Sequence, residues 1–375
     1  MQTTEMFLAM YNPVMSSSIT PWRVLVKGIA LFLIAESVLY SFHPDLQRLN
    51  VFTGSLRRQR FPISTHAPED RALDVGSLDA MLASHIVSEP KAPDEFRILV
   101  LGDSAVWGVG LTPAQTLPGQ LDALGLRCGD KIVRTYNLSF PRSSASKDLM
   151  ILDKAMTYQP DEIIWLVTWY TLMPKTRNDH PLILQNPDEF YKLAHRFDFL
   201  PRDYEQPSIL ARFTDSSRTV FRVIRYQFYS LIELATGLDQ IPGPPEELPA
   251  QLSRDASFEG MKPPRLNPTD VSLDQVRDFY QLAGNVPVIL VNQPMLVLSN
   301  VPNSDIRYND YYPRWVYDQY RQYLAEAAVK NHWEYLDLWN IFPSKYYTDT
   351  PLHLIPEGET ELAKIISHNF IHRCH

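Results

Sequence analysis

The chain has little cysteine and little glycine for its length, with two cysteines and 14 glycines in 375 residues. Cys128 and Cys374 are too few for a disulfide framework and lack metal-ligand spacing. Nothing in their placement pairs them, so we expect two free thiols rather than a bridge. Because glycine is scarce, the 30 prolines predict stiff, ordered loops. Excess positive charge is also absent, since the net charge is -8, and this argues against nucleic acid as a partner.

One apolar segment near the start has the length of a membrane-spanning helix. Residues 24–42 read VLVKGIALFLIAESVLYSF, with Trp22 and Tyr40 placed as interfacial aromatics. We therefore predict a tail at 1–21 and a single-pass membrane anchor at 22–42, with an amphipathic or buried helix as the alternative. Arginines are more numerous after this segment than before it, which favours a cytoplasmic C-terminal body.

Beyond a polar connecting region, 43–95, strand and helix patterns alternate. Apolar, β-branched runs predict strands at 97–101, 132–138, 162–168, 287–292 and 334–338. Helical periodicity appears at 114–125, 144–157, 273–284, 313–331 and 357–371. This alternation predicts an α/β fold, a doubly wound parallel five-stranded sheet of the flavodoxin-like type.

The predicted domain, 96–375, contains an insertion at 173–270 that is too long for an ordinary connection. Within it, residues 218–234 combine apolar and basic side chains at helical spacing. That pattern fits a helix packed on the sheet better than one lying on a membrane surface.

The residues with the clearest chemical meaning follow the first of these strands. Gly102, Asp103 and Ser104 come directly after 97–101, and the carboxyl ends of parallel strands are where such sheets bind ligands. Glycine permits a tight turn there, and the backbone N–H of Ser104 could stabilise an oxyanion. A serine nucleophile needs a base. His353, just before the last helix, is placed to reach back over the sheet.

Three segments resemble the SGNH (GDSL-like) hydrolase family: GDSAVWGVG at 102–110, YNLSFPRSS at 136–144 and DTPLHLIPEG at 349–358. The resemblance implies that Ser104 is the nucleophile and His353 the base of an acyl-enzyme mechanism. The family's spacing would put an orienting aspartate at 350, where Thr350 stands. Asp349, one place earlier, is the candidate for that role; otherwise the site works as a dyad.

The oxyanion hole departs from the family pattern at two positions. Arg142 replaces the glycine of the second segment, and its own N–H could serve if the turn is kept. The asparagine expected after 162–168 is missing, since the chain continues Trp169-Tyr170-Thr171. The candidate donors are therefore the N–H groups of Ser104 and Arg142, with Asn137 or Asn292 as possible substitutes for the missing amide.

The sequence thus favours a serine esterase or O-acyltransferase acting on esters of a carbohydrate or cell-envelope polymer, without metal or cofactor. The resemblance, unlike the charge count, implies an extracytoplasmic body, and it implies a membrane-bound O-acyltransferase as a partner. The alternative is a non-catalytic polysaccharide-binding protein that keeps the fold. A dinucleotide-binding fold is disfavoured, because Pro113 stands where the third glycine of its motif belongs.

Overall fold

The computed structural model describes residues 20–42, 51–54, 56–62, 77–199, 227–228, 230–232, 234–236, 251–348, 350–371 and 374. The chain divides into two compact units, which are described separately. The first comprises residues 1–44 and 205–221, and the second comprises residues 45–204 and 222–375.

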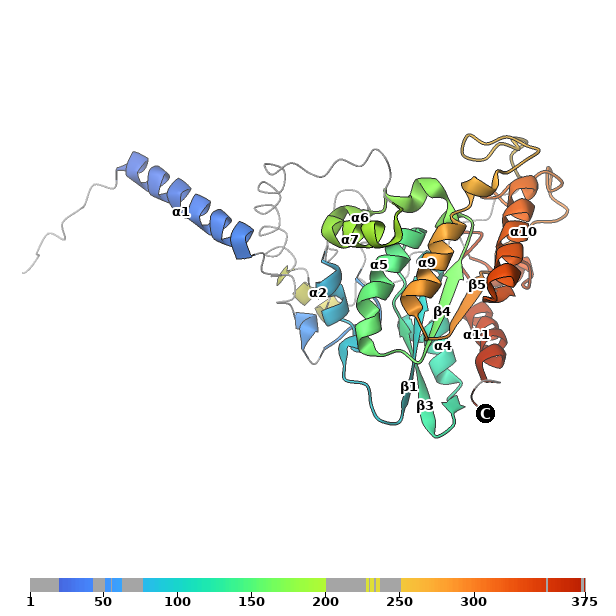
Figure 1. The fold of residues 1–375 in the computed structure, drawn as a ribbon, viewed down its shortest axis with the longest axis horizontal. Coiled ribbons are helices and arrows are strands. Elements are labelled where there is room, and N and C mark those ends of the chain that lie inside the picture. Colours follow the sequence, from blue (N-terminus) through green and yellow to red (C-terminus); the bar gives the residue numbers. More distant parts are fainter. Residues whose placement is uncertain are drawn as a thin grey trace, which may run out of the picture. The chain divides into compact units, whose positions relative to one another are not determined.

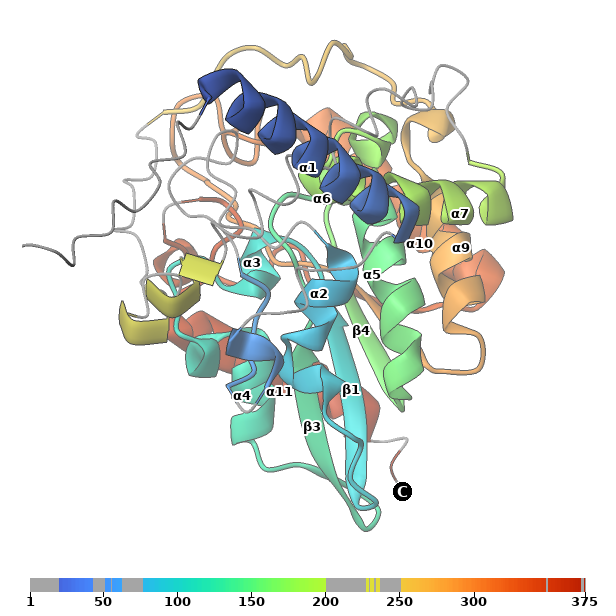
Figure 2. The same cartoon turned by 90° about the vertical axis from the view of Figure 1, so that its left-hand side faces the viewer.

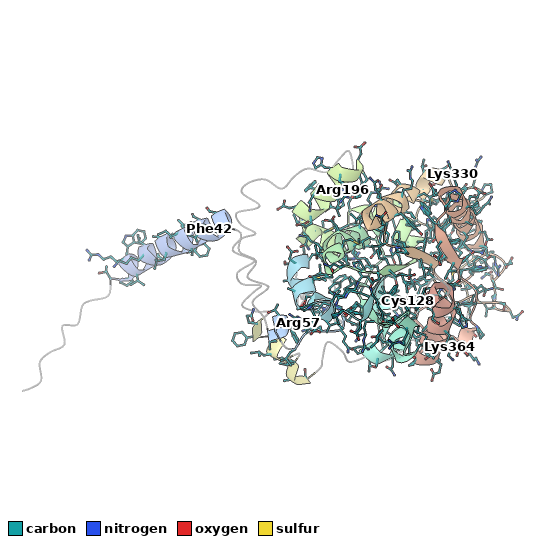
Figure 3. The ribbon with its side chains drawn as sticks, turned by 60° about the horizontal axis from the view of Figure 1, so that its bottom comes forward. Phe42, Arg57, Cys128, Arg196, Lys330 and Lys364 are labelled. Atoms are coloured by element: carbon teal, nitrogen blue, oxygen red, sulfur yellow. A yellow bond between two sulfur atoms is a disulfide. The ribbon has the colours of Figure 1, made fainter. Side chains whose placement is uncertain are left out.

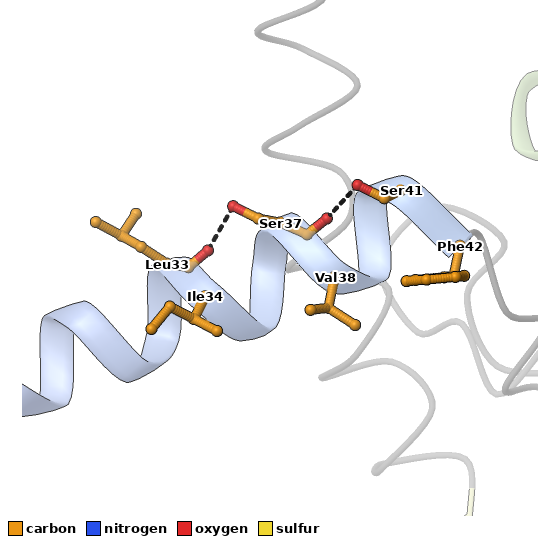
Figure 4. Close-up of a pocket in the computed structure, with 6 residues that line it drawn as sticks. All are labelled: Leu33, Ile34, Ser37, Val38, Ser41 and Phe42. Atoms are coloured by element: carbon orange, nitrogen blue, oxygen red, sulfur yellow. Dashed lines mark hydrogen bonds between the residues drawn. The ribbon is translucent and has the colours of Figure 1, made fainter.

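In the first unit the described residues form α1 (Pro21–Phe42), so the segment predicted as an anchor is confirmed as a helix. The hydroxyls of Ser37 and Ser41 donate to the carbonyl oxygens of Leu33 and Ser37, one turn back, at 2.7 Å each (Figure 4). Among the helices of the described residues, none combines the length and apolar character needed to cross a membrane.

The second unit is built on one sheet (Figure 1). Its strands are β1 (Glu95–Leu101), β2 (Arg127–Cys128), β3 (Lys131–Asn137), β4 (Glu162–Val167), β5 (Val288–Asn292) and β6 (Glu334–Asp337), in the order β2-β3-β1-β4-β5-β6. The five predicted strands are present and parallel. The sheet nevertheless has six strands, because β2 pairs antiparallel with β3 through a turn at Gly129. A two-residue strand is too short to show any periodicity.

Helices cover both faces of this sheet (Figures 1 and 2). One face packs against α2 (Leu78–Ala83), α5 (Ala145–Ala155), α6 (Pro181–Gln185), α7 (Pro187–Phe197), α9 (Leu273–Ala283) and α10 (Arg314–Asn331). The other packs against α3 (Ser104–Trp107), α4 (Leu117–Ala123) and α11 (Pro356–Ile371). Leu99 points to the first layer and Val100 to the second, and both are fully buried. Burial on both faces explains why the strands read as continuous apolar runs.

The strand order places a crevice at the end of β1. The chain passes from β1 to β3 on one side and then to β4 on the other, so the direction of winding reverses at β1. Ligands of doubly wound sheets bind at such reversal points, outside the carboxyl ends of the strands. Ser104 follows β1 at this point.

Parts of the predicted insertion are helical. It contributes the one-turn helix η7 (Pro174–Arg177), then α6 and α7. In the expected amphipathic helix, residues 218–226 lie outside the described residues, whereas 227–228, 230–232 and 234–236 are helical. Phe228 and Leu231 are 70% and 57% exposed there. These two side chains therefore do not pack on the sheet as expected.

The two cysteines form a disulfide, so the expectation of free thiols was wrong (Figure 3, where Cys128 is labelled). Cys128 lies in the short edge strand β2, and Cys374 follows α11. Their Cα atoms are 4.6 Å apart although 246 positions separate them in sequence. The two cysteines meet because Cys374, after α11, lies beside β2. The spacing of the cysteines in the sequence does not indicate this pairing.

Candidate active site

The serine lies in a tight connection between β1 and α3. Asp103 is the N-cap of α3, and its carboxylate accepts a hydrogen bond from the backbone N–H of Ala105 at 3.0 Å. Gly102 is required for close packing rather than for an unusual backbone conformation. A Cβ added there would lie 2.5 Å from Val106 Cγ2 and 3.3 Å from the Leu166 carbonyl oxygen. Ser104, half-buried, is the first residue of α3.

The other end of α3 is fixed by residues distant in sequence. Gly108 ends the helix in the left-handed conformation, with φ 86°. The guanidinium of Arg60 donates to the carbonyl oxygens of Trp107, Gly108 and Leu111 at 3.1, 2.9 and 3.0 Å. Its planar group also lies over the Trp107 ring, 4.0 Å from the ring centre. A residue of the predicted connecting region thus helps to hold the helix that begins with Ser104.

The structure brings His353 to Ser104. His353 Nε2 lies 3.0 Å from Ser104 Oγ, within hydrogen-bond distance, although 249 positions separate the two residues. The histidine is 8% exposed, in the loop between β6 and α11. Its backbone N–H donates to Thr350 Oγ1 at 3.2 Å, and its carbonyl oxygen accepts from the N–H of Thr348 at 3.0 Å. A base in reach of a serine hydroxyl is the arrangement that nucleophilic catalysis requires.

The candidate carboxylate cannot be placed in the same way. Asp349 lies outside the described residues. Thr350, at the position where the resemblance would put an aspartate, binds the backbone of the loop: its Oγ1 accepts from the N–H groups of Leu352 and His353.

Arg142 keeps the turn that its position requires. Its φ is 67°, in the left-handed region that favours glycine, and its side chain is exposed. The neighbouring Ser143 donates to Asp103 Oδ2 at 2.8 Å, which ties this turn to the one that carries Ser104. The backbone geometry of a glycine is therefore preserved without the glycine.

The two proposed substitute amides donate to groups other than the serine. Asn137 Nδ2 donates to the carbonyl oxygen of Val106 at 3.0 Å, so its side chain stabilises α3. Asn292 Nδ2 donates to Asp337 Oδ1 at 2.8 Å, and its oxygen accepts from two buried tyrosine hydroxyls. Both asparagines are consumed by structural hydrogen bonds.

Gln293 lies beside the site and was not anticipated. It follows β5, is 2% exposed, and its Nε2 donates to Asp103 Oδ2 at 3.3 Å. Its Oε1 is buried with no hydrogen-bond partner among the described residues. The only sequence signal for this residue is its position at the carboxyl end of a predicted strand.

A small cavity is lined by residues adjacent in sequence to Ser104 and His353 but not by these two themselves. Its walls include Ala105, which follows Ser104, and Leu352 and Leu354, which flank His353. The remaining lining residues are mostly apolar: Val106, Leu117, Leu166, Gln293, Pro294, Glu359 and Leu362. Its free volume of about 10 Å³ is room for one water-sized group. Burial raises the pKa of the Glu359 carboxyl to about 8, so this wall carries little negative charge at neutral pH.

Comparison with known proteins gives similarity at the level of structure only. No family model and no curated protein matches the sequence. Among solved structures, a lipase/acylhydrolase from Enterococcus faecalis is 14% identical, with 74% of this chain and 96% of that chain covered and a TM-score of 0.35. A carbohydrate acetylesterase from Sinorhizobium meliloti is 11% identical, with 73% and 97% covered and a TM-score of 0.34. An aryl esterase from M. smegmatis is 10% identical, with 73% and 97% covered and a TM-score of 0.37. These scores are too low to carry a residue role or a substrate over to this chain.

Proposed function

We propose that this chain is a serine ester hydrolase of the SGNH type. The observation that carries the proposal is the 3.0 Å contact between Ser104 Oγ and His353 Nε2 at the carboxyl end of β1. A binding protein that merely kept the fold would not need a histidine at this distance from the serine. The alternative of a non-catalytic polysaccharide-binding protein is therefore the less favoured one.

The proposed reaction follows from the roles of the two side chains. His353 accepts the proton of Ser104 while Oγ attacks the carbonyl carbon of the ester, which gives a tetrahedral oxyanion. The backbone N–H groups of Ser104 and Arg142 are the proposed donors to that oxyanion. When the intermediate collapses, the bond to the alcohol oxygen breaks and His353 returns the proton to it. A second alcohol or water then attacks the acyl carbon while His353 again takes the proton, and collapse of this second intermediate breaks the bond to Ser104 Oγ, to which His353 returns the proton.

The size of the cavity favours a short acyl group. The cavity has room for one water-sized group, and Ala105 and Leu352, which line it, are the sequence neighbours of Ser104 and His353, so it is the candidate place for the methyl of an acetyl ester. We therefore propose acetyl as the preferred acyl group. The carbohydrate or envelope polymer as the alcohol comes from the family resemblance, and so does a membrane-bound O-acyltransferase as a partner.

The disulfide supports an extracytoplasmic place of action. Disulfides form and persist in oxidising compartments and are rare in the cytosol. The Cys128–Cys374 bond therefore agrees with the orientation that the family resemblance implied and opposes the one that charge counting favoured.

A fluorophosphonate probe tests the proposed nucleophile. We expect stoichiometric labelling of the native wild type and none of Ser104→Ala, with p-nitrophenyl acetate hydrolysed by the wild type alone. Equal labelling of both proteins, or no labelling of the wild type, would exclude Ser104 as the nucleophile. Release of free acetate in the presence of an excess of sugar acceptor separates hydrolysis from transfer, because transfer lowers the acetate yield.

A further inference from the structure

A lysine with no exposed surface lies directly beneath the proposed oxyanion hole. Lys147, on α5, is 0% exposed. Its Nζ donates to the carbonyl oxygens of Gly102 and Phe140 at 2.7 and 2.6 Å, and it forms an ion pair with Asp148 Oδ1 at 3.0 Å. Lysine is almost never fully buried unless its charge is paired and hydrogen-bonded, so this arrangement calls for an explanation.

The two carbonyl groups belong to the two turns that carry the proposed oxyanion donors. Gly102 precedes Asp103-Ser104, and Phe140 precedes Pro141-Arg142. The turns are also joined directly, because the N–H of Phe140 donates to the Gly102 carbonyl oxygen at 3.2 Å. One ammonium group therefore links the peptide before each donor. Its partner Asp148 is held in turn by Trp165 of β4, whose indole N–H donates to Oδ2 at 2.9 Å.

A second buried side chain holds the Arg142 turn from another element. His180 Nε2 lies 2.9 Å from the carbonyl oxygen of Pro141, and its Nδ1 accepts from the N–H of Leu182 at 3.1 Å. Since Nδ1 is the acceptor, the proton is on Nε2, which donates to Pro141. Burial, with the nearby positive charge of Lys147, lowers the pKa of His180 to about 3. The imidazole therefore keeps this tautomer, uncharged, at every pH at which an esterase is assayed.

We propose that Lys147 and His180 are positioning residues that fix the peptides leading into Ser104 and Arg142, Lys147 through the carbonyl groups of Gly102 and Phe140 and His180 through that of Pro141, and so aim the N–H groups of Ser104 and Arg142 at one oxyanion. The inference rests on the proposed function. Backbone donors cannot adjust by side-chain rotation, so their aim depends on what holds the peptides. Neither residue touches the substrate.

The test separates positioning from stability by kinetics. Lys147→Met combined with Asp148→Asn removes the buried charges together, which avoids leaving one uncompensated. His180→Phe removes the hydrogen bond to Pro141, keeps an aromatic ring against Phe140 and leaves the Lys147–Asp148 ion pair intact. If the lysine variant does not fold, the kinetics of His180→Phe still test whether these residues position the oxyanion donors. With p-nitrophenyl acetate we expect kcat and kcat/KM to fall by the same factor, about 100-fold for the lysine variant, because the interaction is made only in the transition state.

Arg97→Met combined with Glu95→Gln is the matched control, because it too removes a buried ion pair as a whole. Arg97 is 1% exposed, and its ion pair with Glu95 lies at the opposite end of β1 from Ser104. We expect this variant to unfold at a lower temperature and to keep the wild-type kcat per folded molecule. A folded Lys147/Asp148 or His180→Phe variant with wild-type kcat, or with only a raised KM, would overturn the inference while the proposed function stands. A wild type that neither hydrolyses the ester nor takes the phosphonate label on Ser104 would overturn both.

Discussion

Replacing Glu359 by glutamine should make the free energy of unfolding less dependent on pH, so that less stability is lost as the pH rises. Glu359 lies in the first turn of α11 and is 3% exposed, and burial raises its pKa from 4.5 to about 8. The folded state therefore holds a proton that the unfolded chain releases above pH 4.5. The stability associated with this proton is complete below the unfolded pKa and is lost as the pH rises through the folded one.

The size of the effect follows from the shift. One pKa unit corresponds to about 1.4 kcal/mol, so between pH 5 and pH 8 the wild type should lose about 3 to 4 kcal/mol of unfolding free energy relative to Glu359→Gln. Urea unfolding of both proteins at several pH values measures this difference. Other buried groups, such as His85 and Asp148, titrate in both proteins and cancel. Glu357→Gln, on the same turn but exposed, should parallel the wild type. Parallel curves for wild type and Glu359→Gln would refute the reasoning.

Three further changes test other parts of the structure. Gly102→Ala should destabilise the fold by about 1–3 kcal/mol, since its Cβ would lie 2.5 Å from Val106 Cγ2, and by shifting Ser104 it should lower kcat/KM by about 100-fold; wild-type kinetics would contradict this. Cys128→Ser should lower the unfolding free energy by about 2–5 kcal/mol, and a reductant should bring the wild type to the same urea midpoint; a variant as stable as the oxidised wild type would disprove it. His353→Gln should lower kcat by about 10²- to 10⁴-fold with an unchanged unfolding midpoint, as ester-hydrolysis rates and urea curves will show; a kcat close to wild type would rule out a general base at this position.

The sheet and the edge at which Ser104 and His353 meet could be predicted from the sequence for related reasons. A strand buried on both faces is a continuous apolar run, so the stretch that ends at Leu101 can be recognised without its neighbours. The carboxyl ends of parallel strands meet at one edge, so a serine after β1 and a histidine after β6 are expected there together. Position relative to a strand is local information and indicated this edge of the sheet, whereas the choice of His353 among the histidines, and the roles of both residues, rested also on the family resemblance.

The remaining features depend on contacts between distant segments. Lys147 falls in a predicted helix where lysine is ordinarily exposed, and only the packed structure shows that it lies beneath Gly102. Cys128 and Cys374 carry no spacing signal, and Arg60 reads as part of a polar connection although it binds three carbonyl groups of the α3 region. The substitute amides failed for a related reason, because Asn137 has the right chemistry but its donors are used by α3.

These distant contacts explain how the site can lack the amide that its family resemblance calls for. A side-chain donor can be placed by its own rotamer, whereas two backbone donors can be placed only by fixing the peptides that bear them. Arg60 and Asn137 hold α3, Lys147 holds the peptides before both turns, and Ser143 joins one turn to the other through Asp103. Arg60 lies far in sequence from the group Asn137, Ser143 and Lys147, yet all four act on α3 or on the two short turns that carry Ser104 and Arg142. If the N–H groups of Ser104 and Arg142 are the oxyanion donors, as proposed, a rigid frame surrounds both, and rate losses from substitutions within that frame should exceed what their effect on stability predicts.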